Sequence, residues 1–225
     1  MAKPHAMLLT GGGLRSLVAL AMLRDERGPG GEPVRVTMLH LVDGREASPR
    51  RREHLRKQAE AYGVTRLTEP TVRHHYGHSY GKTADGRPRA TLVWPRLLME
   101  AMAEAKFQSA QRVVWPVSVQ GDIQMAAKAT EQAVLVEQML AAEEPFEDRV
   151  APRIEMPLLE MNDQEVLEVG AQLGVDWTLA WSCVGVGVPP DGRACGGCEG
   201  CRRRRAAFEK AGLVDEAEEV QQQPA

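Results

Sequence analysis

The sequence contains no apolar stretch that approaches the roughly 18 residues of a membrane-spanning helix. Its N-terminus also lacks the basic segment and apolar core of a secretory signal, because glycine follows after only a few apolar residues. We therefore expect a cytoplasmic protein with no membrane partner. The charge is nearly balanced, at a formal net value of −3. This balance argues against a surface built throughout for nucleic acid, so RNA is not an expected partner.

Cysteine is scarce and confined to one short stretch. The 225 residues include only four cysteines, all between positions 183 and 201. In a cytoplasmic protein such a group binds a metal more often than it forms disulfides. The chain length suits one domain with a full core and a small appendage.

Apolar runs alternate with helix-like segments along the chain. Runs typical of buried strands occur at 5–10, 34–42 and 112–119. In a later helical segment, Asn162 and Glu165 have capping-box spacing. The alternation predicts an α/β fold, with a parallel sheet and helices on both faces. The expected helices occupy residues 14–25, 47–63, 95–107, 124–142 and 162–174.

The first predicted strand runs directly into three consecutive glycines and then a helix. Successive glycine amides can form a nest for an anion, and the helix N-terminus adds positive charge. The segment lacks both better-known nucleotide loops, G-x-x-x-x-G-K-S/T and G-x-G-x-x-G. A tight turn without a ligand is therefore an equal alternative. The candidate ligand-binding residues are Thr10, Gly11, Gly12, Gly13, Leu14, Arg15 and Ser16.

The spacing of the cysteines is more specific than the glycine loop. Cys195, Cys198 and Cys201 form a C-x-x-C-x-x-C pattern, and Cys183 precedes them. Four thiolates can enclose a tetrahedral zinc ion with no open position, which indicates a structural site. Closely spaced cysteines also hold iron–sulfur clusters, so that interpretation stays open beside the favoured zinc.

Together, these two features resemble the 7-cyano-7-deazaguanine synthase family of PP-loop ATP pyrophosphatases, which acts in queuosine biosynthesis. The resemblance rests on the glycine loop and, above all, on "WSC" and "CGGCEGCRRRRAAF" near the end of the chain. The matching tail residues are Trp181, Ser182, Cys183, Cys195, Gly196, Cys198, Cys201, Arg204, Ala207, Phe208, Ala211 and Gly212.

The resemblance implies an adenine nucleotide alpha-hydrolase-like fold in a homodimer. Residues 1–180 would form the PP-loop-like nucleotide-binding domain, residues 181–212 a zinc-binding segment packed on it, and residues 213–225 a disordered tail. Family members use ATP to activate a carboxylated deazapurine as an acyl-adenylate, release pyrophosphate, and convert the carboxylate to an amide and then a nitrile. The implied cofactors are structural zinc, ATP and magnesium, and the implied partner is a small deazapurine or nucleotide.

The glycine loop departs from the family pattern S-G-G-x-D-S, because Arg15 stands where the family has its aspartate. An arginine cannot help to hold magnesium, but it can grip a phosphate directly or occupy the anion site itself. The family's substrate-side motifs are matched only weakly, at Pro95, Arg96 and Asp122. These departures leave open a repurposed homologue that binds a nucleotide or partner without cleaving ATP. A tRNA-modifying PP-loop protein is a third alternative.

Other segments have two interpretations each. His74, His75 and His78 could bind a metal or a phosphate, although a solvated loop is favoured because no carboxylate stands beside them. The arginines at 202–205 are expected to open the last helix, with alternate arginines facing water rather than contacting RNA. Asp43 could contact a ribose hydroxyl or form a turn with the glycine that follows it.

Overall fold

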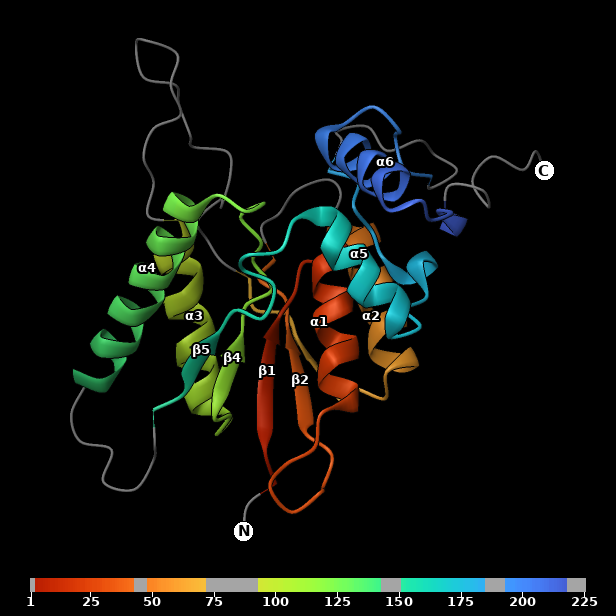
Figure 1. Ribbon diagram of the computed structural model, residues 1–225. Helices are drawn as coiled ribbons and strands as arrows, with labels where there is room; N and C mark the ends of the chain where they lie inside the picture. Colours follow the sequence, from red (N-terminus) through yellow and green to blue (C-terminus); the bar gives the residue numbers. More distant parts are fainter. Residues whose placement is uncertain (1–2, 43–47, 72–92, 143–150, 185–192, 218–225) are drawn as a thin grey trace.

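The computed structural model describes residues 3–42, 48–71, 93–142, 151–184 and 193–217 (Figure 1). Within these parts, five parallel strands form one sheet in the order β3-β2-β1-β4-β5. The central strand is β1, so the loop that follows it leaves from the middle of the sheet. The strands are β1 (His5–Leu9), β2 (Arg35–Leu39), β3 (Arg66–Thr68), β4 (Arg112–Val114) and β5 (Arg153–Glu155).

Helices cover both faces of this sheet, as the alternating sequence pattern predicts. Figure 1 shows α1, α2 and α5 on one side, α3 and α4 on the other, and α6 at the end toward which the strands point. None of the described helices is both long and apolar enough to cross a lipid bilayer. Their bounds are α1 (Leu14–Asp25), α2 (Ser48–Ala61), α3 (Val93–Phe107), α4 (Ile123–Ala142), α5 (Asp163–Gln172) and α6 (Glu199–Ala211), with a short 3-10 turn at Trp177–Leu179.

The central strand is buried on both faces. Ala6 and Leu8 belong to one apolar cluster, while Met7 and Leu9 belong to another on the opposite face. Successive side chains of a strand point to opposite faces, so an unbroken apolar run is what such a strand needs. The same physical rule makes β1 predictable from the sequence.

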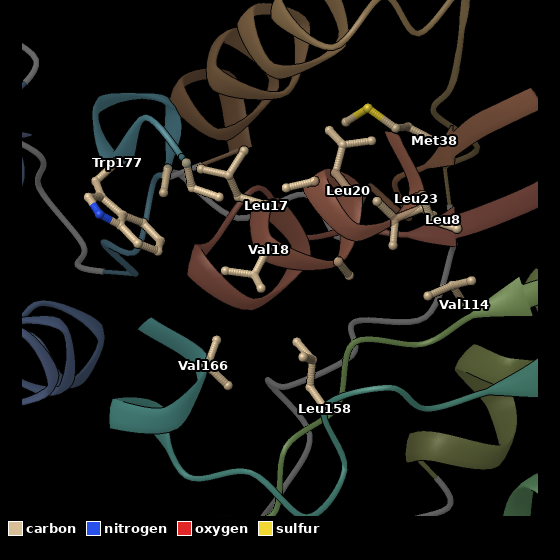
Figure 2. Packing of buried hydrophobic residues seen from close by; sticks show 14 of the residues in the cluster. Leu8, Leu17, Val18, Leu20, Leu23, Met38, Val114, Leu158, Val166 and Trp177 are labelled. Atoms are coloured by element: carbon tan, nitrogen blue, oxygen red, sulfur yellow. The ribbon is translucent and has the colours of Figure 1, made fainter. Parts of the chain in front are cut away.

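The larger of the two clusters packs around α1, which contributes side chains from several sides. Figure 2 shows residues of α1 surrounded by side chains from the strands, from α5 and from the 3-10 turn. The labelled residues are Leu8, Leu17, Val18, Leu20, Leu23, Met38, Val114, Leu158, Val166 and Trp177. Since α1 is fixed on so many sides, the position of its N-terminus at the glycine loop is fixed too.

The sequence does not predict β3 and β5, the strands at the two edges of the sheet. Each is only three residues long, and each carries polar residues at both ends. Such strands lack the apolar run of a buried strand, so their pairing with β2 and β4 cannot be read from local composition. The capping box of α5 is confirmed, because Asn162 and Glu165 exchange side-chain and backbone hydrogen bonds.

Close packing at Gly170 holds α5 against α1 and the 3-10 turn. A Cβ at this position would lie 2.2 Å from Cη2 of Trp177 and 2.8 Å from Cγ2 of Val18. Although alanine is the better helix former by about 1 kcal/mol, we expect Gly170→Ala to lower the free energy of unfolding by about 1–3 kcal/mol through overpacking. Urea unfolding would measure this loss. Gln172→Ala, at the exposed end of the same helix, is the control, and equal effects of the two changes would contradict the packing.

Candidate functional site

The loop after β1 turns sharply at Gly12. Its φ is 76°, in the left-handed region, and an added Cβ would approach the side chains of Arg51 at 3.3 Å and Leu55 at 3.4 Å. The Gly12 amide donates a hydrogen bond to Oγ1 of Thr10 at 3.1 Å. The turn therefore needs glycine at this position, and the Thr10 hydroxyl helps to shape it.

The loop leads into α1, whose N-terminus carries no capping side chain. The N-cap residue is Gly13, no side-chain hydrogen bond caps the helix, and its first turn has no acidic residue. The first amides of a helix have no acceptor within the helix, and together they carry a partial positive charge. This end of α1 is therefore suited to an anion, which is one of the two interpretations that the sequence allows for the loop.

The Gly12 carbonyl anchors the loop to two distant parts of the chain. It accepts a hydrogen bond from the Trp181 amide at 2.8 Å and another from Nε2 of Gln58 at 2.9 Å. Gln58 is fully buried in α2 and also donates to the Leu179 carbonyl at 2.9 Å. Sequence analysis misses Gln58, because a buried glutamine in a basic helix has no motif that marks it.

A cavity of about 380 Å³ lies beside the loop. The glycine loop and the start of α1 line one part of it, while the segment after the 3-10 turn, α5 and α6 line another. The structure thus brings the loop and the C-terminal motif together at one site. The lining residues are Gly11, Gly13, Leu14, Arg15, Ser16, Arg51, Pro116, Asp163, Trp181, Ser182, Val184, Gly200, Arg203, Arg204 and Ala207.

A second cavity, of about 300 Å³, adjoins the first at Gly11, Arg51 and Pro116. It is formed at the carboxyl ends of β1, β2 and β4, where ligands of parallel α/β sheets bind. Its walls are largely apolar, and its remaining lining residues are Leu9, Thr10, His40, Leu41, Leu97 and Trp115.

Arg15 is held in the first cavity by an ion pair with Asp163. Nη2 and Nε of Arg15 lie 2.7 Å and 3.1 Å from Oδ1 of Asp163, and Nη1 donates to the Ser118 carbonyl at 3.2 Å. The other carboxylate oxygen, Oδ2, accepts from Nη2 of Arg203 at 3.0 Å. Burial raises the pKa of Asp163, but the hydrogen bonds from Arg15 and Arg203 outweigh it and leave that pKa below its usual range. Asp163 is therefore an ionised carboxylate between two guanidinium groups.

The four cysteines converge at the N-terminal end of α6, where Cys198 is the N-cap residue. Their sulfur atoms all lie within 4.8 Å of one another, with Cys198 Sγ 3.9 Å from that of Cys183 and 3.5 Å from that of Cys201. Sulfurs around a tetrahedral zinc, at about 2.3 Å each, are separated by about 3.8 Å. The donor set and its spacing therefore fit one metal ion, and the C-terminal segment is a metal-knuckle arrangement.

The thiols of this cluster differ in acidity. Burial raises the pKa of Cys198, but hydrogen bonds from the amides of Val184 and Cys201 outweigh it and lower that pKa to about 6. Burial, the hydrogen bond with Cys198 and the charge of Cys183 raise the pKa of Cys201. The Cys198 thiolate is thus favoured at neutral pH, and a metal ion would displace the proton of Cys201.

Of the arginines at 202–205, Arg204 does not face water. Its side chain is 8% exposed and pairs with Asp215, whose side chain is 7% exposed. The same guanidinium donates to the carbonyls of Ala180 at 2.8 Å and Trp177 at 2.9 Å. Arg204 is therefore a buried structural residue, because the chain after α6 returns to supply its carboxylate.

The chain just after α6 also differs from the expected disordered tail. Residues 213–217 are described, Leu213 packs against the main apolar cluster, and Asp215 binds Arg204. A buried guanidinium needs a nearby carboxylate, which gives this short segment a reason to pack.

Several other candidate residues play no part in the two cavities or are not described. Asp122 accepts hydrogen bonds from the amides of Gln124 and Met125 and so caps the start of α4. Asp43 and the histidines at 74, 75 and 78 lie outside the described residues.

Comparisons with known proteins agree with this arrangement. Residues 109–212 match the family model described as "Queuosine biosynthesis protein QueC". The chain is 46% identical over 76 residues to the 7-cyano-7-deazaguanine synthase of Solidesulfovibrio magneticus, a match covering 34% of this chain and 32% of that protein. The corresponding enzyme of Cupriavidus taiwanensis is 46% identical over 63 residues, which cover 28% of this chain and 27% of that one. The matches therefore span about a third or less of these relatives' length.

A solved structure shares the fold at low sequence identity. The U34-tRNA thiolase NcsA from Methanococcus maripaludis, with its 4Fe-4S cluster, superposes with a TM-score of 0.53 over 99% of this chain and 73% of that chain. The identity is 12%, so this likeness concerns the fold alone.

The parallel sheet, its covering helices and the loop at the carboxyl end of β1 define the class as a parallel α/β protein, a fold that this solved structure shares. The family match then gives the particular relationship. Residues 109–212 are similar to the QueC family, which confirms the resemblance predicted from the sequence for that part of the chain.

We expect the purified chain to hold about one metal ion and to lose it when a ligand is removed. Cys198→Ser should lower the metal-to-protein ratio, because one of the four sulfur ligands is gone. Elemental analysis measures the ratio, and visible absorbance distinguishes an iron–sulfur cluster from colourless zinc. Arg202→Ala, at an exposed neighbouring position, should leave the ratio unchanged. A metal-free preparation from metal-replete cells would contradict the site.

The buried pair of Arg204 and Asp215 is expected to contribute to the stability of the fold. Arg204→Met leaves a buried carboxylate without its partner, so we expect the free energy of unfolding to fall by about 3–5 kcal/mol. Chemical denaturation of the metal-loaded chain measures the loss. The matched control is Arg202→Met, which changes an exposed arginine of the same helix. If both changes lowered the free energy of unfolding by a similar small amount, the pair would not be required for stability.

Proposed function

We propose that this chain binds an adenine nucleotide with its phosphates at the glycine loop and acts in the reaction class of the deazaguanine synthases. The observation that supports this proposal is the shared cavity of about 380 Å³. It is lined by the loop, by the uncapped start of α1 and by Trp181 and Ser182, which belong to the family-matched segment.

The two adjoining cavities suggest how a nucleotide would lie. The amides at the start of α1 face the first cavity, so this is the place for the phosphates. The second cavity has apolar walls that include Leu41, Leu97 and Trp115, which suit a purine ring. Gly11 lines both cavities and has open space where a Cβ would be, so a ligand can pass across it.

The proposed reaction begins when a carboxylate oxygen of the deazapurine attacks the α-phosphorus of ATP. The bond between the α- and β-phosphates breaks, pyrophosphate leaves, and an acyl-adenylate forms. Ammonia then displaces AMP to give the amide. A second ATP then adenylates the amide oxygen and releases a second pyrophosphate, and loss of AMP together with the remaining protons on nitrogen leaves the nitrile. The positive charges beside the loop would stabilise the departing pyrophosphate.

A second candidate function follows from the Arg15–Asp163 pair. An arginine that already pairs with a carboxylate at the loop suits a homologue that binds a nucleotide or a partner without cleaving ATP. Both candidates need the same anion site, and only turnover separates them. For tRNA modification, the third alternative, the likeness to NcsA gives no support beyond the fold.

The test is pyrophosphate release from ATP with 7-carboxy-7-deazaguanine, ammonium and magnesium. For the synthase, release should depend on the deazapurine and fall about 100-fold in Gly12→Ala, because the strained loop misplaces the reacting groups. Gly31→Ala is a matched control, since Gly31 also has a positive φ of 82° but lies in the turn before β2. Background release with the unchanged chain would reject the synthase and leave the second candidate.

Further expectations from the resemblance belong to the same proposal. They are zinc as the metal, a homodimer, a cytoplasmic location, and a nucleotide-binding domain at 1–180 with a metal-binding segment at 181–212. The hydrogen bond from the Trp181 amide to Gly12 supports close packing of the second part on the first.

A further inference from the structure

Magnesium, which the resemblance implies at the phosphates, does not fit the described side chains of this site. A magnesium ion bound with a nucleotide usually takes one or two protein carboxylates. Among the described residues lining the two cavities, Asp163 is the one carboxylate. Both of its oxygens already accept hydrogen bonds from guanidinium groups, Oδ1 from Arg15 and Oδ2 from Arg203. A magnesium ion at Asp163 would have to break two ion pairs and would face two positive charges.

The same groups are well arranged for a phosphate. Arg15 is fixed from two sides, by Asp163 and by the Ser118 carbonyl, so little side-chain freedom remains to be lost on binding. Arg203 is half exposed and reaches the same carboxylate from α6. Two guanidinium groups share one carboxylate, which leaves a net positive charge beside the uncapped start of α1. Arginine binds phosphate oxygens through paired, charge-assisted hydrogen bonds.

We propose that Arg15 and Arg203 bind the nucleotide phosphates directly, in the role that the resemblance gives to magnesium, and that nucleotide binding is therefore independent of magnesium. This inference rests on the proposed nucleotide site. Asp163 keeps the two guanidinium groups in place while the cavity is empty, and an incoming phosphate competes with it for them. Magnesium bound to ATP masks phosphate charge, so it weakens binding to such a site instead of supporting it.

The experiment is calorimetric titration of the full, metal-loaded chain with an ATP analogue whose α–β bridge is a methylene group. One buffer is freed of magnesium with a chelating resin, which spares the cysteine-bound metal, and the other contains magnesium in excess over the nucleotide. We expect affinity without magnesium to equal or exceed affinity with it. Binding that appears only with magnesium would overturn the inference while leaving the proposed nucleotide site intact. No binding in either buffer would instead reject the proposed site.

Variants assign the effect to the two arginines. Arg15→Ala and Arg203→Ala should each weaken magnesium-free binding by about tenfold or more, the factor expected when a charge-assisted hydrogen bond is lost. Arg202→Ala, an exposed neighbour on α6, should bind as the unchanged chain does. If Arg15→Ala lowers the melting temperature, the half-exposed Arg203 still provides the test. The assignment of phosphate binding to the two arginines would be overturned if Arg203→Ala and an Arg15 variant, either Arg15→Ala or Arg15→Lys, each kept the nucleotide affinity of the unchanged chain.

A change at Asp163 should raise nucleotide affinity, whereas the arginine variants should lower it. Asp163→Asn removes the competing charge but keeps the side-chain size, so nucleotide affinity should rise in magnesium-free buffer. A fall in affinity would contradict the role of Asp163 as a competitor of the phosphate.

Discussion

The carbonyl oxygen of Gly12 is the point on which the arrangement of this site depends. It accepts one hydrogen bond from the Trp181 amide and one from the buried side chain of Gln58. Three segments far apart in the sequence therefore meet at one atom: the glycine loop, α2, and the chain that leads into the cysteines. A buried carbonyl that loses its donors costs about 1–3 kcal/mol. The C-terminal segment thus helps to hold the loop in its shape.

This connection explains why the cysteine cluster and the cavity form one unit. Cys183 follows Trp181 by two residues, and Gly200 in α6 packs so tightly on the Ser182 carbonyl that a Cβ would lie 2.0 Å from it. A metal ion held by the cysteines would fix the wall of the cavity without touching a ligand. The metal is then a support for the site, which agrees with a closed set of four sulfurs.

Much of the fold could be predicted from the sequence, but the network around the loop could not. The central strand and the capping box of α5 follow local rules of alternation and spacing, and the four cysteines follow a ligand pattern. The pair of Arg15 with Asp163 joins residues 148 positions apart, and the bond from Gln58 to Gly12 spans 46. Local periodicity holds no information about such partners. Arg15 was expected to add positive charge to an anion site; the structure adds the carboxylate that it shares with Arg203.

The pairing of Arg204 with Asp215 extends the described fold beyond the family match. The family match stops at residue 212. The buried guanidinium of Arg204 is nevertheless neutralised by Asp215, which lies three residues beyond the end of that match. Proteolytic trimming back to the edge of the matched segment would remove this carboxylate and leave the guanidinium without its counter-ion. The fold therefore continues past the last residue of the family match, and shortened forms of the protein should retain Asp215.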